Sequence, residues 1–246
     1  MMRPFESIRQ SVSQNSKVQE LASVESLRRF LWLTVFTIPM HFVLAWWFNR
    51  YQTAATPLET MEWAHALRTL HGITGAIVLT LACFVRWVVR PKGRATLAGI
   101  ALHILLCITY LAFGVAASLL DVNFAGAGGI SPYIIVCITM GVISLMSPAI
   151  SIALFSGAFL TFWGAIAWID FTPAMLANLL INSIAATAMS LIASVMHWNQ
   201  YVKITQLQEQ LGRAIQIIGQ KYVPIGTVDE HHAPTLPPWI GPRDDQ

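Results

Sequence analysis

Long apolar runs, separated by short polar segments, dominate the pattern of the chain. Six runs are long enough, or nearly so, to cross a bilayer as helices, which requires about 20 apolar residues each. They cover residues 30–48, 69–89, 96–120, 130–146, 149–169 and 174–198, and the fourth is the shortest. The pattern predicts an all-α fold: a polytopic six-helix transmembrane bundle within residues 30–198 that contacts the lipid bilayer.

The fourth and fifth runs are separated only by Ser147 and Pro148. Proline cannot continue a helix without breaking its hydrogen-bond pattern. We therefore expect these two runs to form a tight helical hairpin or one long kinked helix.

The pattern changes after Trp198, where the chain becomes polar but keeps a helical period. Apolar residues then recur at alternating spacings of three and four, at Ile204, Leu207, Leu211, Ala214 and Ile218. Such spacing is typical of the pairing face of a coiled coil. It predicts a connecting helix over residues 199–221 with a homodimer seam formed by Ile204, Leu207, Leu211 and Ile218.

The alternative for residues 199–221 is an amphipathic helix lying on the membrane surface. Its polar face is rich in glutamine and has only Lys203, Arg213 and Lys221 as cations, whereas interfacial helices carry more. The pairing helix is therefore favoured. The segment 222–246 contains five prolines and no apolar period, so we expect a disordered tail.

Composition and charge add an orientation to this picture. The chain is 55% hydrophobic and only 11% charged, whereas soluble domains carry about 25% charged residues. Five Lys or Arg precede residue 30, four lie at the end of the second run or between it and the third, and four follow Trp198, out of 15 in all. Lys and Arg mark cytoplasmic segments. We expect residues 1–29 and the C-terminal part to be cytoplasmic, at a cell inner (plasma) membrane, and no nucleic-acid partner.

Three histidines lie near the predicted outer ends of the first two runs, at His41, His65 and His71. With nearby aromatic and acidic residues they are positioned to form an outward-facing ligand site, for which we select His41, Trp46, Glu62, Trp63 and His71. Histidines also serve as metal or haem ligands, or as simple hydrogen-bonded interhelical residues. His65 and His71 do not share a helical face. A pocket for a small, partly apolar ligand is favoured, with no metal and no cofactor.

The polar and small residues inside the apolar runs bear on the class of membrane protein and on how its helices pack. No Asp or Glu lies well inside any run, and membrane carboxylates are typical of proton-coupled transporters. Ala186, Ser190 and Ser194 repeat every four residues, a small-residue spacing that lets helices approach closely in lipid. This stripe packs either within the chain's own bundle or between two copies.

The architecture resembles the MASE-type membrane sensor region of bacterial diguanylate cyclases and the similar six-span inputs of sensor kinases and adenylate cyclases. The resemblance covers residues 1–220 and rests on the basic N-terminal segment, the six runs and the glutamine-rich helix "ITQLQEQLGRAIQII". It implies that a signal passes through the last helix to a cytoplasmic output. No GG(D/E)EF, EAL or HExxN motif is present, so no catalytic residue is assigned.

The sequence thus predicts an integral membrane sensor or anchor module without a catalytic domain. It would respond to a ligand or membrane signal and act on an output such as a diguanylate cyclase. The alternatives are a small membrane transporter, a non-catalytic subunit of a membrane complex, or an integral-membrane enzyme with histidine ligands. The last would need a denser histidine cluster than His41, His65 and His71 supply.

Overall fold

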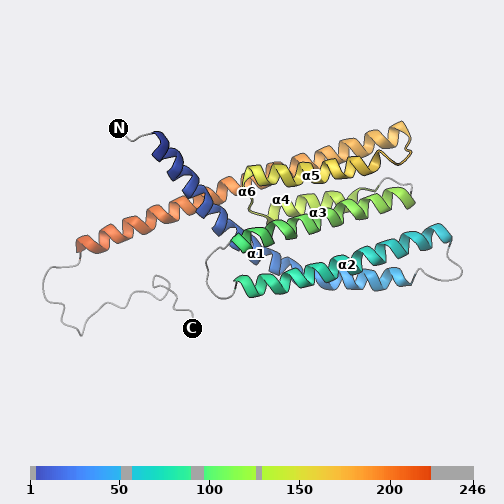
Figure 1. The fold of residues 1–246 in the computed structure, drawn as a ribbon, viewed down its shortest axis with the longest axis horizontal. Helices are drawn as coiled ribbons and strands as arrows, with labels where there is room; N and C mark the ends of the chain where they lie inside the picture. The colour runs from blue at the N-terminus through green and yellow to red at the C-terminus, as the bar shows by residue number, and fades with distance from the viewer. Residues whose placement is uncertain (1–3, 51–56, 90–96, 126–128, 223–246) are drawn as a thin grey trace. The chain divides into compact units, whose positions relative to one another are not determined.

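The computed structural model describes residues 4–50, 57–89, 97–125 and 129–222 of the chain. These residues form six helices (Figure 1): α1 Pro4–Asn49, α2 Leu58–Val89, α3 Leu97–Ala125, α4 Ser131–Ile143, α5 Pro148–Ile166 and α6 Pro173–Tyr222. Five of them are long and apolar enough to cross a membrane, and α4, with 13 residues, is shorter. The predicted all-α fold is confirmed, and the chain is a multi-pass membrane protein.

The chain divides into two compact units, Met1–Lys203 and Ile204–Gln246. The first holds α1 to α5 and the first part of α6. The second contains the rest of α6, which ends at Tyr222. The tail predicted to be disordered lies, from residue 223 onward, outside the described residues.

Hydrogen bonds near helix ends establish the direction of α2, α3 and α4 in the first unit. Trp63, near the start of α2, donates its indole N–H to Asp121 Oδ1, near the end of α3 (3.1 Å). The backbone N–H of Tyr133, at the start of α4, donates to Ser118 Oγ, also near the end of α3 (2.9 Å). Helix α3 therefore runs antiparallel to both of its neighbours.

Contacts near helix ends also establish the directions of α5 and α6. The ring of Tyr133 stacks on that of Phe162, near the end of α5, with 5.2 Å between centroids. Ser151, near the start of α5, hydrogen-bonds to Ser194 (2.7 Å), whereas the Trp163 indole donates to Ser183 (3.0 Å). Helices α4 and α5 thus form an antiparallel hairpin rather than one kinked helix, and α6 runs antiparallel to α5.

The turn between α4 and α5, residues 144–147, is not helical although it is largely buried. Its backbone groups are satisfied by side chains of α1: Leu145 N–H donates to Ser26 Oγ (2.8 Å) and Ser147 N–H donates to Gln19 Oε1 (3.2 Å). Buried backbone N–H groups need such partners. We call residues 144–147 the α4–α5 turn.

The α4–α5 turn also contacts the last helix. Leu145 forms a small apolar cluster with Val18 and Ala22 of α1 and Trp198 of α6. Val18 and Ala22 of α1 and Trp198 of α6 therefore lie at the same end of the bundle.

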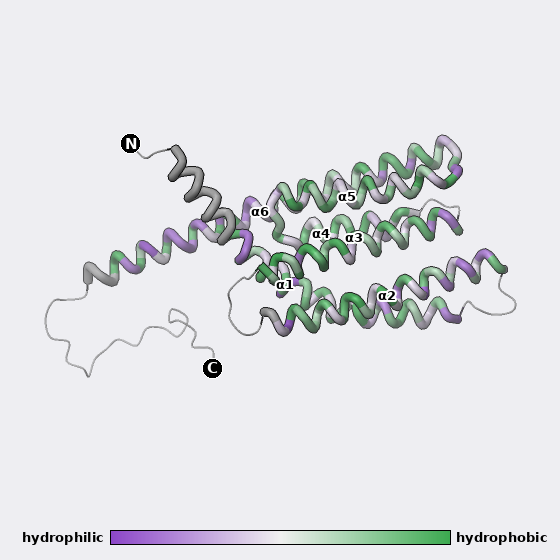
Figure 2. Tube along the Cα trace, viewed as in Figure 1, coloured by the Kyte–Doolittle hydropathy of each residue, from purple (hydrophilic) through white to green (hydrophobic). Residues whose placement is uncertain are grey.

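Apolar side chains cover much of the outer surface of the bundle. Figure 2 shows hydrophobic residues along α3, α4 and α5 and more hydrophilic residues in the C-terminal part of α6. Large side chains such as Trp32 (74% exposed), Trp87 (74%) and Leu160 (67%) project from α1, α2 and α5. Soluble proteins rarely expose apolar surface on this scale, whereas a bilayer accommodates it.

The small-residue stripe of α6 faces the interior of its own bundle. Ala186, Ser190 and Ser194 are all at most 2% exposed. A Cβ atom added to Gly141 of α4 would lie 2.6 Å from the Ser190 carbonyl oxygen. The stripe and Gly141 therefore bring the backbones of α4 and α6 into direct contact, which answers the question left open by the sequence.

Candidate functional site

Two of the predicted ligand residues meet inside the bundle. His41 of α1 and His71 of α2 are 6% and 8% exposed, and their Nδ1 atoms lie 2.9 Å apart in a hydrogen bond. Gly75, one turn after His71, lets the two helices approach, since a Cβ atom there would lie 3.1 Å from the Cβ of His41. We call these two residues the histidine pair.

The hydrogen bond of the histidine pair fixes the hydrogen positions of both neutral rings. One Nδ1 must carry a hydrogen and the other must be bare to accept it. A neutral imidazole carries one hydrogen in total. The ring that donates through Nδ1 therefore keeps a bare Nε2 acceptor, and its partner keeps an Nε2–H donor. The pair can offer one donor and one acceptor to a third group.

Aromatic rings hold the histidine pair in place. Phe113 of α3 meets both imidazoles edge-on, with centroids 4.8 Å from His41 and 5.1 Å from His71. Phe48 stacks on His71, and Trp63 meets Phe48 edge-on at 5.4 Å. Trp63 is thus joined to the pair through Phe48. The sequence carried no signal for Phe48 and Phe113, because aromatic residues within an apolar run are indistinguishable from ordinary packing residues.

The histidine pair borders a cavity of 280 Å³ between α1, α2, α3 and α4. We call it the histidine cavity. It is lined by Leu33, Thr37, Met40, His41, Leu44, His71, Tyr110, Phe113, Ile135, Val136, Thr139 and Met140. The hydroxyls of Thr37 and Tyr110 hydrogen-bond to each other (2.8 Å). The lining contains five polar side chains and no charged one.

Two predicted site residues lie elsewhere. Trp46 is 55% exposed and has the Arg50 guanidinium 4.3 Å from its ring centroid. Glu62 is exposed and borders a separate shallow hollow of 360 Å³. The reason is helical geometry. A helix turns about 100° per residue, so Trp46 lies about 140° from His41 around α1 and Glu62 about 180° from His71 around α2.

His65 is the third histidine near the predicted outer ends of the first two runs. It is exposed and lines that same hollow beside Glu62. It is separate from the histidine pair. In the part of the chain that the structure describes, no three His, Cys, Asp or Glu side chains form a group suited to hold a metal ion. The contact that the structure shows between the two imidazoles is the hydrogen bond between their Nδ1 atoms.

Helix α4 has the histidine cavity on one side and α6 on the other. Val136, Thr139 and Met140 line the cavity. Tyr133 hydrogen-bonds through its hydroxyl to Thr187 of α6 (2.8 Å), and Gly141 touches the backbone of Ser190. This short helix therefore lines the cavity on one face and packs against α6 on another.

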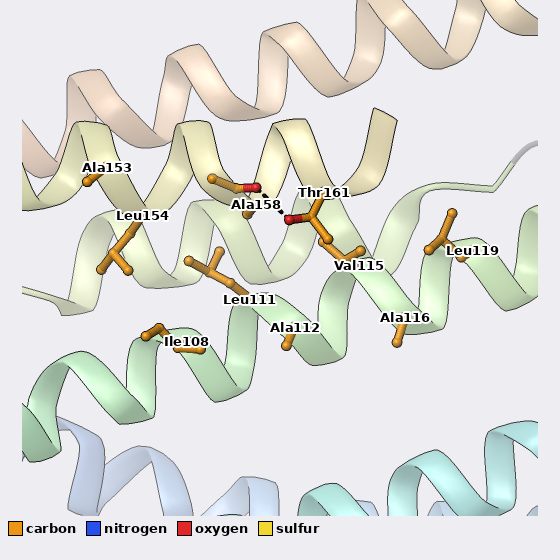
Figure 3. Close-up of a pocket in the computed structure, with 11 residues that line it drawn as sticks. Ile108, Leu111, Ala112, Val115, Ala116, Leu119, Ala153, Leu154, Ala158 and Thr161 are labelled. Atoms are coloured by element: carbon orange, nitrogen blue, oxygen red, sulfur yellow. Dashed lines mark hydrogen bonds between the residues drawn. The ribbon is translucent and has the colours of Figure 1, made fainter. Parts of the chain in front are cut away.

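A second hollow, of 420 Å³, lies between α3 and α5 (Figure 3). Its lining consists of Ile108, Leu111, Ala112, Val115, Ala116, Leu119, Ala153, Leu154, Gly157, Ala158 and Thr161. The only hydroxyl, that of Thr161, already donates to the Gly157 carbonyl (2.8 Å). The hollow offers apolar contact but no hydrogen-bonding group to select a ligand.

His103 lies on α3 away from the histidine cavity. It is 1% exposed, its ring lies 5.8 Å from that of Phe30, and its Nε2 has no hydrogen-bond partner among the described residues. One turn later on α3, Cys107 hydrogen-bonds through its Sγ to Ser144 Oγ of the α4–α5 turn (3.2 Å). These two side chains contribute to packing beside that turn.

The predicted seam residues lie in the second unit, on the C-terminal part of α6. Ile204, Leu207, Leu211 and Ile218 are each between 53% and 62% exposed. Glu209 and Arg213 form an exposed ion pair at 3.8 Å on the same helix. The apolar seam is thus open to solvent within this chain.

Comparison of this chain with protein-family models, with curated proteins and with solved structures found no match.

Proposed function

We propose that this chain is the input module of a membrane signalling system. In this proposal, a ligand in the histidine cavity changes the packing of α4 against α6, and α6 carries the change to an output such as a diguanylate cyclase. The observation that supports it best is the position of α4, which borders both the cavity and α6.

The contact between α4 and α6 supports direct transmission. Met140 lines the cavity, and the next residue, Gly141, touches the Ser190 backbone so closely that a Cβ atom would be 2.6 Å from its oxygen. Packed interiors have little free space and transmit strain. A small shift of α4 would therefore have to be matched by α6. Such coupling requires a ligand that binds one arrangement better than the other.

A second contact supports transmission at the Trp198 end of the bundle. Helix α1 lines the cavity through Thr37 and His41, and it also holds the α4–α5 turn through Ser26. The turn packs, through Leu145, against Trp198 of α6. A movement of α1 or α4 would thus reach α6 six residues before the first seam residue, Ile204.

The orientation and the output belong to the same proposal. Thirteen of the 15 Lys and Arg residues lie in segments that the positive-inside rule assigns to the cytoplasm. The exposed seam would then pair two copies in the cytoplasm, beside a fused or separate output protein. The resemblance to MASE-type sensor regions is in keeping with this arrangement.

The experiment is to fuse an active diguanylate cyclase domain after Gln220 and compare two glycine variants. Gly141→Ala places a methyl group against Ser190, whereas a Cβ atom at Gly164 of α5 would meet nothing within 4 Å. We expect Gly141→Ala to change cyclase activity several-fold and Gly164→Ala to leave it unchanged. Elution volume and melting temperature check that both variants fold. Equal activity in two folded variants would contradict coupling through α4.

A further inference from the structure

The ligand of the histidine cavity can be described by class from the chemistry of its lining. No lining side chain carries a carboxylate, ammonium or guanidinium group. Asp121, near the end of α3, accepts a hydrogen bond from Trp63 and is not part of the lining. Burying an unpaired charge is very costly. The cavity therefore suits a neutral molecule.

The polar side chains of the lining select an oxygen-containing head group. In the Thr37–Tyr110 pair only one hydroxyl hydrogen is used between the two residues, which leaves the other available. Thr139 lines the cavity, and its hydroxyl has no hydrogen bond to another described residue. The histidine pair can add one donor and one acceptor. A hydroxyl or carbonyl oxygen matches this set.

The rest of the lining is apolar and mostly aliphatic, with Leu33, Leu44, Ile135 and Val136 among its members and Phe113 as its one aromatic ring. The volume of 280 Å³ is just below the range of about 300–1,000 Å³ for small-molecule sites. A compact head group and a short apolar chain fill such a space. A molecule of this kind also partitions into a bilayer.

We propose that the histidine cavity binds a neutral, lipid-like alcohol or ketone. Its oxygen would hydrogen-bond to polar residues of the lining, among them Thr37, His41, Tyr110 and Thr139, and its chain would contact the apolar residues of the lining. This inference rests on the proposed function only in taking this cavity as the ligand site.

The test uses photoreactive probes that share one diazirine-bearing ten-carbon chain and differ at the end: an alcohol, a ketone, a carboxylate or a hydrocarbon. The full chain is reconstituted in lipid nanodiscs, irradiated, and the labelled residues are located by peptide mass spectrometry. We expect the alcohol and ketone to label the cavity walls on α1, α3 and α4. Excess unlabelled 1-decanol should displace them. The hydrocarbon should label lipid-facing residues without displacement, and the carboxylate should not label the cavity.

Variants identify the groups that select the head group. Thr139→Val keeps the shape of the side chain but removes its hydroxyl. We expect about fivefold weaker labelling by the alcohol, the factor for one typical hydrogen bond, and the same for Thr37→Val. Thr80→Val is the matched control, because the Thr80 hydroxyl is exposed on α2 and donates to the Ala76 carbonyl.

Three results would overturn the inference: cavity labelling by the hydrocarbon equal to that by the alcohol, stronger labelling by the carboxylate, or no displacement by 1-decanol. The activity of a fused cyclase tests the proposed function separately from the ligand class. If the alcohol labels the cavity but does not alter a fused cyclase, the ligand class stands and the relay is wrong. If cyclase activity responds to Gly141→Ala while no alcohol or ketone binds, the relay stands and the ligand class is wrong.

Discussion

At the scale of single residues, the hydrogen bond between His41 and His71 gives the cavity its polar character. The two imidazoles come from different helices and are surrounded by Phe48 and Phe113. Each ring satisfies a nitrogen of the other in a place where few other partners exist. Removing one ring therefore leaves a polar atom of the other without its partner.

A double-mutant cycle tests this dependence. We expect His41→Leu and His71→Leu each to lower the free energy of unfolding by about 1–3 kcal/mol, the cost of a buried polar group left unsatisfied. The double variant should cost clearly less than the sum, with a coupling energy of about 0.5–3 kcal/mol. Unfolding in mixed micelles measures all four proteins. Strictly additive losses would show that the two rings do not depend on each other.

Part of this site could be predicted from the sequence and part could not, because helix rotation and helix packing decide which residues share the cavity. His41 and His71 were identifiable as rare polar residues within apolar runs. Trp46 and Glu62 were grouped with them by nearness along the chain, although helical rotation places them on other faces. Tyr110, Thr139 and Phe113 come from the third and fourth runs, and only the packing of those helices shows that they share the cavity.

At the scale of elements, α4 and the turn that follows it are the distinctive parts of the bundle. The apolar run over 130–146 predicted a longer helix, whereas α4 ends at Ile143 and residues 144–147 leave the helical path. Apolar pattern alone could not show this end, because Leu145 and Met146 are as apolar as the helix itself. Both side chains are buried, and the backbone N–H groups of Leu145 and Ser147 donate to side chains of α1, which stabilises the non-helical turn.

Removing one of those side-chain acceptors should weaken the bundle. Ser26→Ala takes away the acceptor of the buried Leu145 N–H, and we expect a loss of about 1–3 kcal/mol in the free energy of unfolding. Ser131→Ala, at an exposed position on the first turn of α4, is the control and should change it by less than about 0.5 kcal/mol. Denaturation in mixed micelles compares them. A Ser26→Ala protein as stable as the control would show that the turn does not need this bond.

The first helix extends further than the apolar pattern indicated. The first run begins at residue 30, but α1 begins at Pro4, and Ala22 and Leu27 are fully buried. Hydrophobic pattern identifies the part of a helix that meets lipid. It does not identify a more polar extension that packs against its own protein, here against the α4–α5 turn and Trp198.

At the scale of the whole molecule, the apolar pattern was enough to predict the class and the order of the helices. The alternating direction of α1 to α6 follows from short connections between long apolar helices. The interhelical hydrogen bonds, together with the stacking of Tyr133 on Phe162, confirm it for α2 to α6. The apolar seam on the second unit is exposed, and its proposed partner is a second copy of the chain.

The seam is tested by placing charge on it. Leu207→Asp together with Leu211→Asp would put carboxylates at two consecutive seam positions, where a parallel pair brings like charges together. We expect the cyclase fusion to lose dimer in nanodisc or detergent mass measurements and to lose most of its activity. Gln206→Asp with Gln216→Asp, at exposed positions away from the seam and from the residues that flank it, is the matched control and should remain dimeric. Unchanged mass and activity in the seam variant would contradict the pairing role.

The central claim is that the histidine cavity and α6 are coupled through α4. The most direct measurement is cyclase activity of the fusion in nanodiscs as 1-decanol is added, for the unchanged chain, Thr139→Val, Gly141→Ala and Gly164→Ala. We expect a several-fold change in the unchanged chain and in Gly164→Ala. In Thr139→Val the response should shift to higher decanol concentrations, and in Gly141→Ala it should be altered or absent. The same response in all four folded proteins would contradict it.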